Sequence, residues 1–171
     1  MYWEYQKNSI HPGNVGGRPG KTINNAFVML KSWINYKWRE GKVVMGLFLD
    51  VKSAYPSVHQ KRLNHLLRQR TFPPYLCHII DSFLSDRTAS LKIDDYISRN
   101  FSILNGLPQE SPLSVMLYLI YNSSLLLPNS PSLNENNISI AYIDDLTHLL
   151  AADNIQEIQH KAEEVMARSK N

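Results

Sequence analysis

A run of apolar residues over 43–49 ends abruptly at Asp50. Both alternating faces of this run are apolar, which is typical of a β-strand that other parts of the protein cover on both sides. A second apolar strand is predicted over residues 138–143, followed by a tight turn at Asp144-Asp145 and a third strand over 146–150. Because helices are predicted before, between and after these strands, we expect a mixed α/β fold in which a small antiparallel sheet packs on helices.

Helical periodicity accounts for most of the chain outside the strands. Apolar residues recur at helical spacing and stop at turn or capping residues, which predicts helices over about residues 23–40, 57–70, 75–84, 111–127 and 153–168. Thr22 can cap the first helix. Ser57 with Gln60, and Asp153 with Gln156, have the spacing of a capping box. The face of the first helix that we expect to be buried carries Ala26, Phe27, Leu30, Trp33, Ile34 and Trp38.

Two aspartate pairs lie at predicted hairpin turns, and their surroundings differ. Asp94-Asp95 lies within residues 88–104, where apolar and polar residues alternate, so we expect a solvated two-stranded ribbon and an ordinary turn. The strands that flank Asp144-Asp145 are apolar. Aspartate is common in turns because it tolerates turn geometry and can bond its own backbone. From the residues alone, Asp144-Asp145 is therefore either a turn or a metal-binding pair.

The metal-binding interpretation depends on the placement of Asp50. If its strand is a neighbour of the later hairpin, Asp50 and Asp144 point into the same small volume at the edge of the sheet. Clustered carboxylates raise one another's pKa unless a cation neutralises them. Mg²⁺ prefers hard oxygen ligands of this kind, and two such ions can act together in phosphoryl transfer.

Composition limits the alternatives. The chain has 171 residues and 43% hydrophobic residues, which is enough for one domain with a core. Its single cysteine, Cys77, excludes an intramolecular disulfide and a cysteine-based zinc site. No apolar run reaches the roughly 18 residues of a membrane span. The net charge of +3 permits nucleic-acid binding without requiring it.

Four segments together resemble the reverse transcriptases of non-LTR (LINE-like) retrotransposons. Residues 48–58 (FLDVKSAYPSV) resemble the first catalytic motif, residues 105–114 (NGLPQESPLS) the second, and residues 141–145 (AYIDD) the third. Residues 16–22 (GGRPGKT) resemble a fingers-region motif of the same elements. The four occur in the family's order and cover about residues 10–170. The resemblance implies a polymerase palm and fingers architecture.

The resemblance also implies a metal site. Asp50, Asp144 and Asp145 would be the catalytic carboxylates, and the backbone carbonyl of Val51 would be a further metal ligand. The cofactors would be two Mg²⁺ ions, which Mn²⁺ can replace. The reaction would be nucleotidyl transfer by RNA-directed DNA polymerase in retrotransposition.

Further residues would contact the substrates. Tyr55 would lie under the incoming sugar and exclude a 2′-hydroxyl, and Gln109 would hydrogen-bond near the incoming nucleotide. Arg18 and Lys21 would approach phosphates of the template or the nucleotide. The partners implied are an RNA template with a DNA primer, and dNTPs, with no membrane. We expect a nuclear or cytoplasmic protein that is not secreted.

The resemblance covers only part of the family's polymerase domain. We expect residues 1–171 to be a partial reverse transcriptase domain, with a fingers remnant at about 10–42, a palm over 43–171 and an inserted ribbon at about 88–104. We expect the thumb to be absent from residues 1–171. The missing fingers and thumb segments are expected from a larger polyprotein.

Two positions depart from the family pattern. Glu110 stands where the family usually has glycine, which lets the backbone approach the nucleotide or adopt a positive φ. Pro56 stands where the family usually has an acidic residue or asparagine. An alternative function therefore stays open, a catalytically inactive retrotransposon relic that acts at most as an RNA- or metal-binding module. A viral RNA-dependent RNA polymerase is disfavoured by Tyr55 and by the Ala-Tyr-Ile sequence before the aspartate pair.

Overall fold

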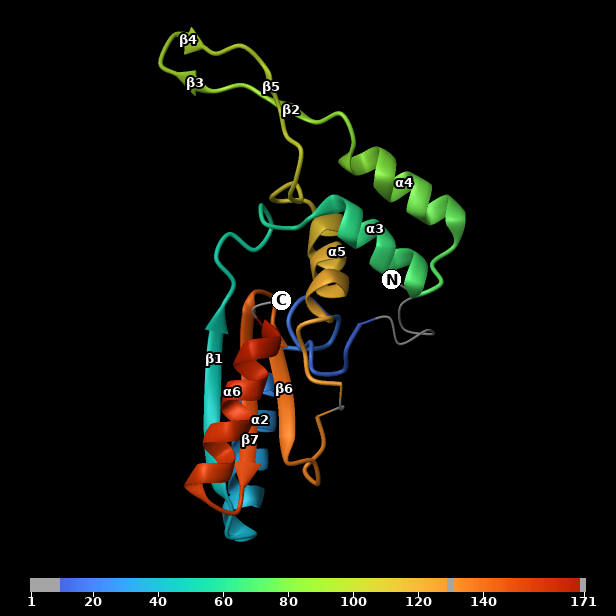
Figure 1. The fold of residues 1–171 in the computed structure, drawn as a ribbon. Coiled ribbons are helices and arrows are strands. Elements are labelled where there is room, and N and C mark those ends of the chain that lie inside the picture. The colour runs from blue at the N-terminus through green and yellow to red at the C-terminus, as the bar shows by residue number, and fades with distance from the viewer. Residues whose placement is uncertain (1–9, 129–130, 170–171) are drawn as a thin grey trace. The chain divides into compact units, whose positions relative to one another are not determined.

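The computed structural model describes residues 10–128 and 131–169 (Figure 1). The chain divides into two compact units. The sheet unit comprises the residues up to Val51 together with those from Asn122 onward, and the helical unit comprises Lys52–Tyr121. In the described part of the chain, no helix is both long and apolar enough to cross a membrane.

The sheet unit contains a three-stranded antiparallel sheet. Its strands are β1 (Val43–Asp50), β6 (Asn137–Tyr142) and β7 (Asp145–Ala152), in the order β1-β7-β6. The register pairs β1 with β7 along its whole length, from Val43 opposite Ala152 to Asp50 opposite Asp145. The predicted antiparallel sheet is therefore confirmed, and the pairing of β1 with β7 answers the open question of whether the strand of Asp50 lies beside the later hairpin.

The expected burial of β1 on both sides is wrong. β1 is an edge strand, in which half-buried and exposed residues alternate from Met45 onward, and Phe48 is 73% exposed. The strand that is buried on both sides is β7, because it lies in the centre of the sheet. A strand that is apolar on both faces can lie at the edge or in the centre of a sheet. Only its pairing with neighbouring strands distinguishes these two positions.

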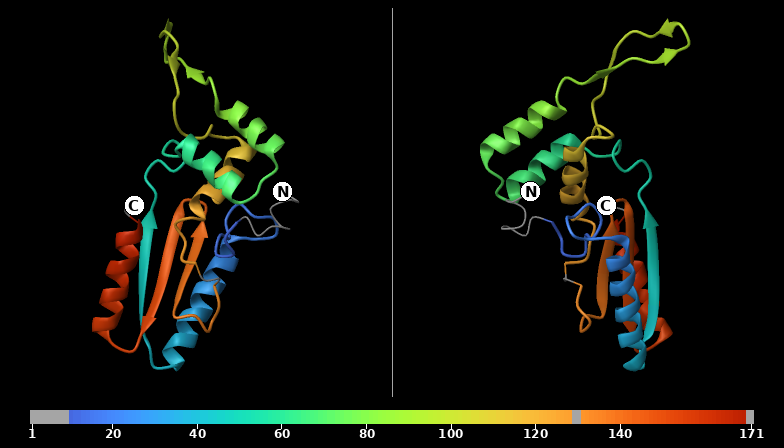
Figure 2. Two further views of the ribbon diagram at one scale, coloured as in Figure 1. Left: turned by 45° about the vertical axis from the view of Figure 1, so that its right-hand side comes forward. Right: turned by 180° about the vertical axis from the view of Figure 1, so that it is seen from behind.

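Two helices cover the two faces of this sheet (Figure 2). Helix α2 (Ile23–Arg39) packs on one face, where Trp33 and Leu149 belong to the same buried cluster. Helix α6 (Ile155–Ser169) packs on the other face, against a cluster that contains Leu150 and Ile158. The result is a helix–sheet–helix arrangement, in agreement with the expected α/β class.

The helix termini and faces differ in detail from expectation. Phe27 and Trp38 of α2 are 61% and 62% exposed, so its buried face is narrower than the apolar pattern indicates. The N-terminal cap of α6 is shifted by one residue. Asn154 Oδ1, and not Asp153, accepts a hydrogen bond from the Glu157 N–H at 2.9 Å.

A buried polar pair lies on the α6 face of the sheet. The Ser139 hydroxyl and His148 Nδ1 are 2.7 Å apart, and the Leu127 N–H donates to the same hydroxyl at 2.9 Å. His148 is 1% exposed. Burial lowers the pKa of His148 to about 4, because a charged imidazolium would lose its hydration there.

The helical unit contains three helices and a ribbon. Its elements are α3 (Gln60–Gln69), α4 (Pro74–Leu84), β2 (Thr88–Ala89), β3 (Lys92–Ile93), β4 (Tyr96–Ile97), β5 (Phe101–Ser102) and α5 (Pro112–Asn122). The short strands pair as β2 with β5 and β3 with β4, which confirms the exposed ribbon and its turn at Asp94-Asp95.

Two expectations for the helical unit are wrong. The capping box of Ser57 and Gln60 does not form, because the Ser57 hydroxyl donates to the Ala54 carbonyl at 2.9 Å and α3 begins only at Gln60. Helix α5 ends at Asn122, five residues before its predicted end, and the chain then turns. Apolar residues continue past Asn122, and periodicity alone therefore extends the helix too far.

Candidate active site at the end of the sheet

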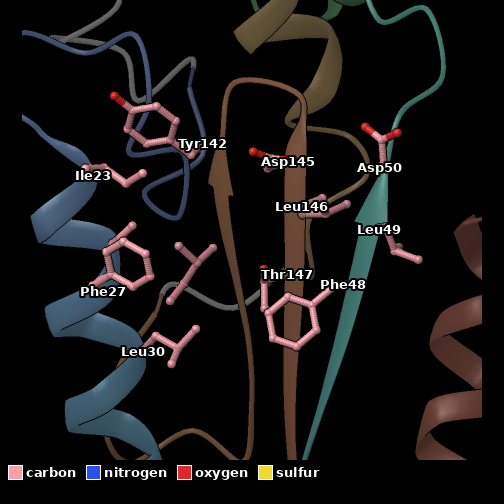
Figure 3. A pocket seen from close by; sticks show the side chains of 12 residues that line it. Ile23, Phe27, Leu30, Phe48, Leu49, Asp50, Tyr142, Asp145, Leu146 and Thr147 are labelled. Carbon is pink, nitrogen blue, oxygen red and sulfur yellow. The ribbon is translucent and has the colours of Figure 1, made fainter.

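Two acidic residues lie at one end of the sheet, at the ends of two neighbouring strands (Figure 3). Asp50 is the last residue of β1, and the register places it opposite Asp145, the first residue of β7. Tyr142 of β6 completes the same row, opposite Asp145. Directly opposite residues of antiparallel strands project their side chains from the same face, so both carboxylates lie on the face that α2 covers. Both residues are exposed to solvent.

Asp144 lies in the turn that joins β6 to β7. The predicted turn was Asp144-Asp145, whereas the observed turn residues are Ile143 and Asp144, because Asp145 already pairs in the sheet. Ile143 has a φ of 59°. This left-handed conformation is rare for a β-branched residue and indicates local strain.

The register makes Asp145, and not Asp144, the direct partner of Asp50. Within residues 10–128 and 131–169, no group of three or more histidine, cysteine, aspartate or glutamate residues is arranged to hold a metal ion. The three predicted carboxylates thus share one end of the sheet without forming a closed ligand cluster. An open pair of carboxylates still suits Mg²⁺, which takes one or two protein carboxylates and completes its shell with water and phosphate.

An apolar cleft of about 320 Å³ adjoins the carboxylates on the same face of the sheet (Figure 3). Phe27 and Leu30 of α2 line one side, and Phe48 and Thr147 of the strands line the other. Asp50, Tyr142 and Asp145 also line this cleft. The exposed aromatic rings of Phe27 and Phe48 are thereby explained, because both border the cleft.

The other predicted residues of the sheet unit lie near the ends of its elements. Val51 follows Asp50 directly, at the end of β1. Arg18 and Lys21 lie in the loop before α2, and the Arg18 guanidinium donates to the Asn14 carbonyl at 3.3 Å. Lys21 is exposed. All of these residues belong to the same compact unit as the carboxylates.

Tyr55 and Gln109 lie in the helical unit, apart in the chain from the carboxylates. The Tyr55 ring packs on the Tyr118 ring, with 5.2 Å between the centroids. The Tyr55 carbonyl accepts a hydrogen bond from the Leu107 N–H at 2.9 Å, which ties the first-motif segment to the second-motif loop. Gln109 is exposed at the end of that loop.

Glycine and glutamate at the second-motif loop both have a left-handed backbone. Gly106 has a φ of 82°, and an added Cβ would lie 2.8 Å from the Pro56 Cα, so this position requires glycine. Glu110 has a φ of 62°. The φ at position 110 is therefore the conformation that glycine adopts most easily, although the residue is glutamate.

Sequence reasoning missed the role of two residues at the Ile143-Asp144 turn, Asn122 and Gly16. Asn122 donates from Nδ2 to the Ile143 carbonyl at 2.9 Å, and the backbone of Gly16 packs against Tyr142 and Ile143. A signal for Asn122 existed, since it is a lone amide directly after an apolar helical run. Nothing in the sequence indicated what Asn122 contacts.

The fold and the site define a class. A small antiparallel sheet between helices, with aspartates at the ends of two paired strands and a third in the adjoining turn, is the arrangement expected of a polymerase palm.

Comparison with known proteins identifies the family. Residues 3–171 match the family described as reverse transcriptase (RNA-dependent DNA polymerase), and the chain belongs to this family. One relative is the RNA-directed DNA polymerase from mobile element jockey of Drosophila melanogaster, 33% identical over 113 residues, or 65% of this chain and 12% of that protein. Another is the probable RNA-directed DNA polymerase from transposon X-element of the same organism, 27% identical over 125 residues, or 69% of this chain and 14% of that protein. The predicted resemblance to non-LTR retrotransposon enzymes is confirmed.

Proposed function

We propose that this chain supplies the palm of an RNA-directed DNA polymerase that acts in retrotransposition, with Asp50, Asp144 and Asp145 as its catalytic carboxylates. The observation that carries the proposal is the pairing of Asp50 with Asp145 at the end of the sheet, next to the turn that holds Asp144. The chain belongs to the reverse transcriptase family, which supports the same assignment. The chain spans only 12% and 14% of the two relatives, so the activity of a whole polymerase is part of the proposal.

The donor set fits divalent cations. Reverse transcriptases generally use divalent metal ions. Asp50 and Asp145 are exposed carboxylates on one face, Asp144 is half-buried beside them, and the carbonyl of Val51 follows Asp50. These hard oxygen donors suit two Mg²⁺ ions or Mn²⁺. When bound, such ions would neutralise phosphate charge and activate the attacking oxygen.

The reaction proposed is nucleotidyl transfer. A primer 3′-hydroxyl attacks the α-phosphate of a dNTP paired to an RNA template, a new phosphodiester bond forms, and pyrophosphate leaves. The protein contributes position and charge, because this chemistry needs no covalent intermediate. Tyr55 would border the sugar of the incoming nucleotide, Gln109 would hydrogen-bond near it, and Arg18 and Lys21 would approach phosphates. The assignment of residues 10–42 as a fingers remnant and of residues 43–171 as the palm belongs to this proposal.

A second candidate function is a catalytically inactive retrotransposon relic that binds RNA or metal. Glu110 favours it, because this residue places a negative charge beside Gln109, where nucleotide phosphates would have to approach. Its backbone is also held in a conformation that glutamate disfavours.

Primer extension on poly(rA)·oligo(dT) distinguishes the two functions. With Mg²⁺ or Mn²⁺, extension by the wild-type chain should be lost in Asp50→Ala and in Asp144→Ala. Asp94→Ala is the matched control, since it removes an aspartate from the other, solvated hairpin turn. Extension no greater than that of Asp144→Ala would reject polymerase activity for this chain. Binding of Mn²⁺ that depends on Asp50, without extension, would then favour the relic.

A further inference from the structure

The turn that carries Asp144 has a backbone that its own residues do not favour. Ile143 has a φ of 59°, in the left-handed region. A β-branched side chain is a genuine outlier there, because its Cβ substituents crowd the backbone. Such a conformation persists only where the surrounding structure enforces it. The neighbours of this turn therefore decide where Asp144 and Asp145 are placed.

Asn122 holds the turn through its side chain. This residue is completely buried, and its Nδ2 atom donates to the Ile143 carbonyl at 2.9 Å. The bond fixes the peptide group that joins Ile143 to Asp144. Among the described residues, Asn122 Oδ1 has no hydrogen-bond partner. Burying a side-chain amide whose oxygen has no hydrogen-bond partner is unfavourable. The hydrogen bond from Nδ2 to the Ile143 carbonyl therefore explains why a polar residue occupies this position.

A loop holds the same turn from the open edge of β6. The Val15 N–H donates to the Ala141 carbonyl at 2.8 Å, and the Ala141 N–H donates to the Gly13 carbonyl at 2.8 Å. This short parallel pairing ends at Gly16, directly against the turn. A Cβ on Gly16 would lie 2.6 Å from the Ile143 nitrogen and 2.8 Å from the Tyr142 Cα. These are backbone atoms, so an added methyl group must displace either the loop or the turn.

The two supports are joined to each other. The Asn14 amide donates to the Ser123 hydroxyl at 2.9 Å, and the His11 N–H donates to the same hydroxyl at 3.0 Å. Ser123 follows Asn122 in the chain. The loop and residues 122–123 thus form one hydrogen-bonded frame around the turn.

We propose that Asn122 and Gly16 are positioning residues that hold the Ile143-Asp144 turn in its left-handed conformation and so fix the place of Asp144 and Asp145. The inference rests on the proposed function only in giving these aspartates a catalytic role. That the frame holds the turn can be tested without activity.

Amide hydrogen exchange tests the frame. We expect Asn122→Leu, which keeps a similar volume without the donor, and Gly16→Ala to raise the exchange rate of the Asp145 amide at least tenfold beyond any change in global stability. The matched controls are Asn137→Leu, at the opposite end of β6, and Gly46→Ala, whose Cβ would meet only side-chain atoms, the closest at 3.0 Å. Exchange at Asp145 that rises no more than in these controls overturns the inference.

A rescue variant covers the case in which Asn122→Leu does not fold. Glycine adopts a positive φ without support. The double variant Asn122→Leu with Ile143→Gly should therefore fold and recover slow exchange at Asp145. If it does not recover, Asn122 acts elsewhere than at the turn, and the inference fails.

Binding of Mn²⁺, measured by the electron paramagnetic resonance of the free ion, separates this inference from the proposed function. Loss of a hydrogen bond that orients a metal ligand typically weakens metal binding by about 10–100-fold. We expect Asn122→Leu to weaken Mn²⁺ binding by about tenfold, with no change in Asn137→Leu. If the wild-type chain binds no Mn²⁺ in an Asp50-dependent manner while the exchange result holds, the proposed metal site fails and the positioning role stands. If Mn²⁺ binding depends on Asp50 but is unaffected in Asn122→Leu, the positioning role fails alone.

Discussion

Replacing Glu110 by glycine should stabilise the protein. Glu110 is exposed, and its φ of 62° lies in the left-handed region. That conformation costs an L-residue roughly 1–2 kcal/mol, which glycine does not incur. Glycine also raises the conformational entropy of the unfolded chain, which favours unfolding by about 0.4–1 kcal/mol. The net gain in the free energy of unfolding should be about 0.8 kcal/mol, the difference between the midpoints of these two ranges.

Urea and thermal unfolding followed by circular dichroism measure this gain. For a chain of this length, the melting temperature should rise by about 1–4 °C. Glu110→Ala is the decisive control, because alanine removes the charge but keeps the unfavourable φ. We expect Glu110→Ala to leave the stability within about 0.5 kcal/mol of wild type. Equal stabilisation by alanine and glycine would assign the effect to charge, and no stabilisation by glycine would refute strain at this position.

The same substitution bears on the choice between polymerase and relic. Glu110→Gly removes a negative charge directly after Gln109 and leaves the loop conformation unchanged. If the chain is a polymerase impaired at this position, primer extension should increase in Glu110→Gly. If extension by the wild-type chain and by Glu110→Gly both stay at the level of Asp144→Ala, the result would favour the relic.

Three further outcomes are expected. The free energy of unfolding should fall by about 3 kcal/mol between pH 6.5 and pH 4. In the unfolded chain His148 is protonated below its ordinary pKa of 6.5, whereas in the folded chain it is protonated only below a pKa of about 4. Urea unfolding at several pH values should show a smaller fall in His148→Leu and an unchanged fall in the exposed His160→Gln. Leu149→Ala, in the core beneath α2, should cost roughly 2–5 kcal/mol in urea unfolding, whereas Leu104→Ala, 78% exposed, should cost less than about 0.5 kcal/mol. Mg²⁺ at about ten times its dissociation constant should stabilise the wild type by about 1.4 kcal/mol in thermal unfolding but not Asp50→Ala, and an equal effect on both would contradict the metal site.

Much of the sheet unit could be predicted because its signals are local. The apolar strand before Asp50, the hairpin around Asp144 and the helices on either side follow from periodicity and turn residues. Cap positions were less predictable. Ser57 and Gln60 satisfy the capping-box spacing, yet Ser57 bonds Ala54 instead, because a hydroxyl has several local acceptors within reach.

Burial and pairing could not be predicted, because they depend on residues far apart in the chain. Phe48 lies in an apolar run, but β1 has a neighbour on one side only, so this ring borders a cleft. The apolar sequence around His148 did not predict its contact with Ser139, because that contact arises from the register of β6 with β7.

The sequence by itself determined the family, because the segments around Asp50 and around Asp144-Asp145 occur in the order of a reverse transcriptase. Only the tertiary structure decided which of these aspartates are paired across neighbouring strands. The antiparallel register sets Asp50 opposite Asp145 and leaves Asp144 in the turn. The conformation of that turn was also decided by tertiary contacts, because Ile143 does not adopt a positive φ by its own preference and is held there by Asn122, 21 residues away in the chain.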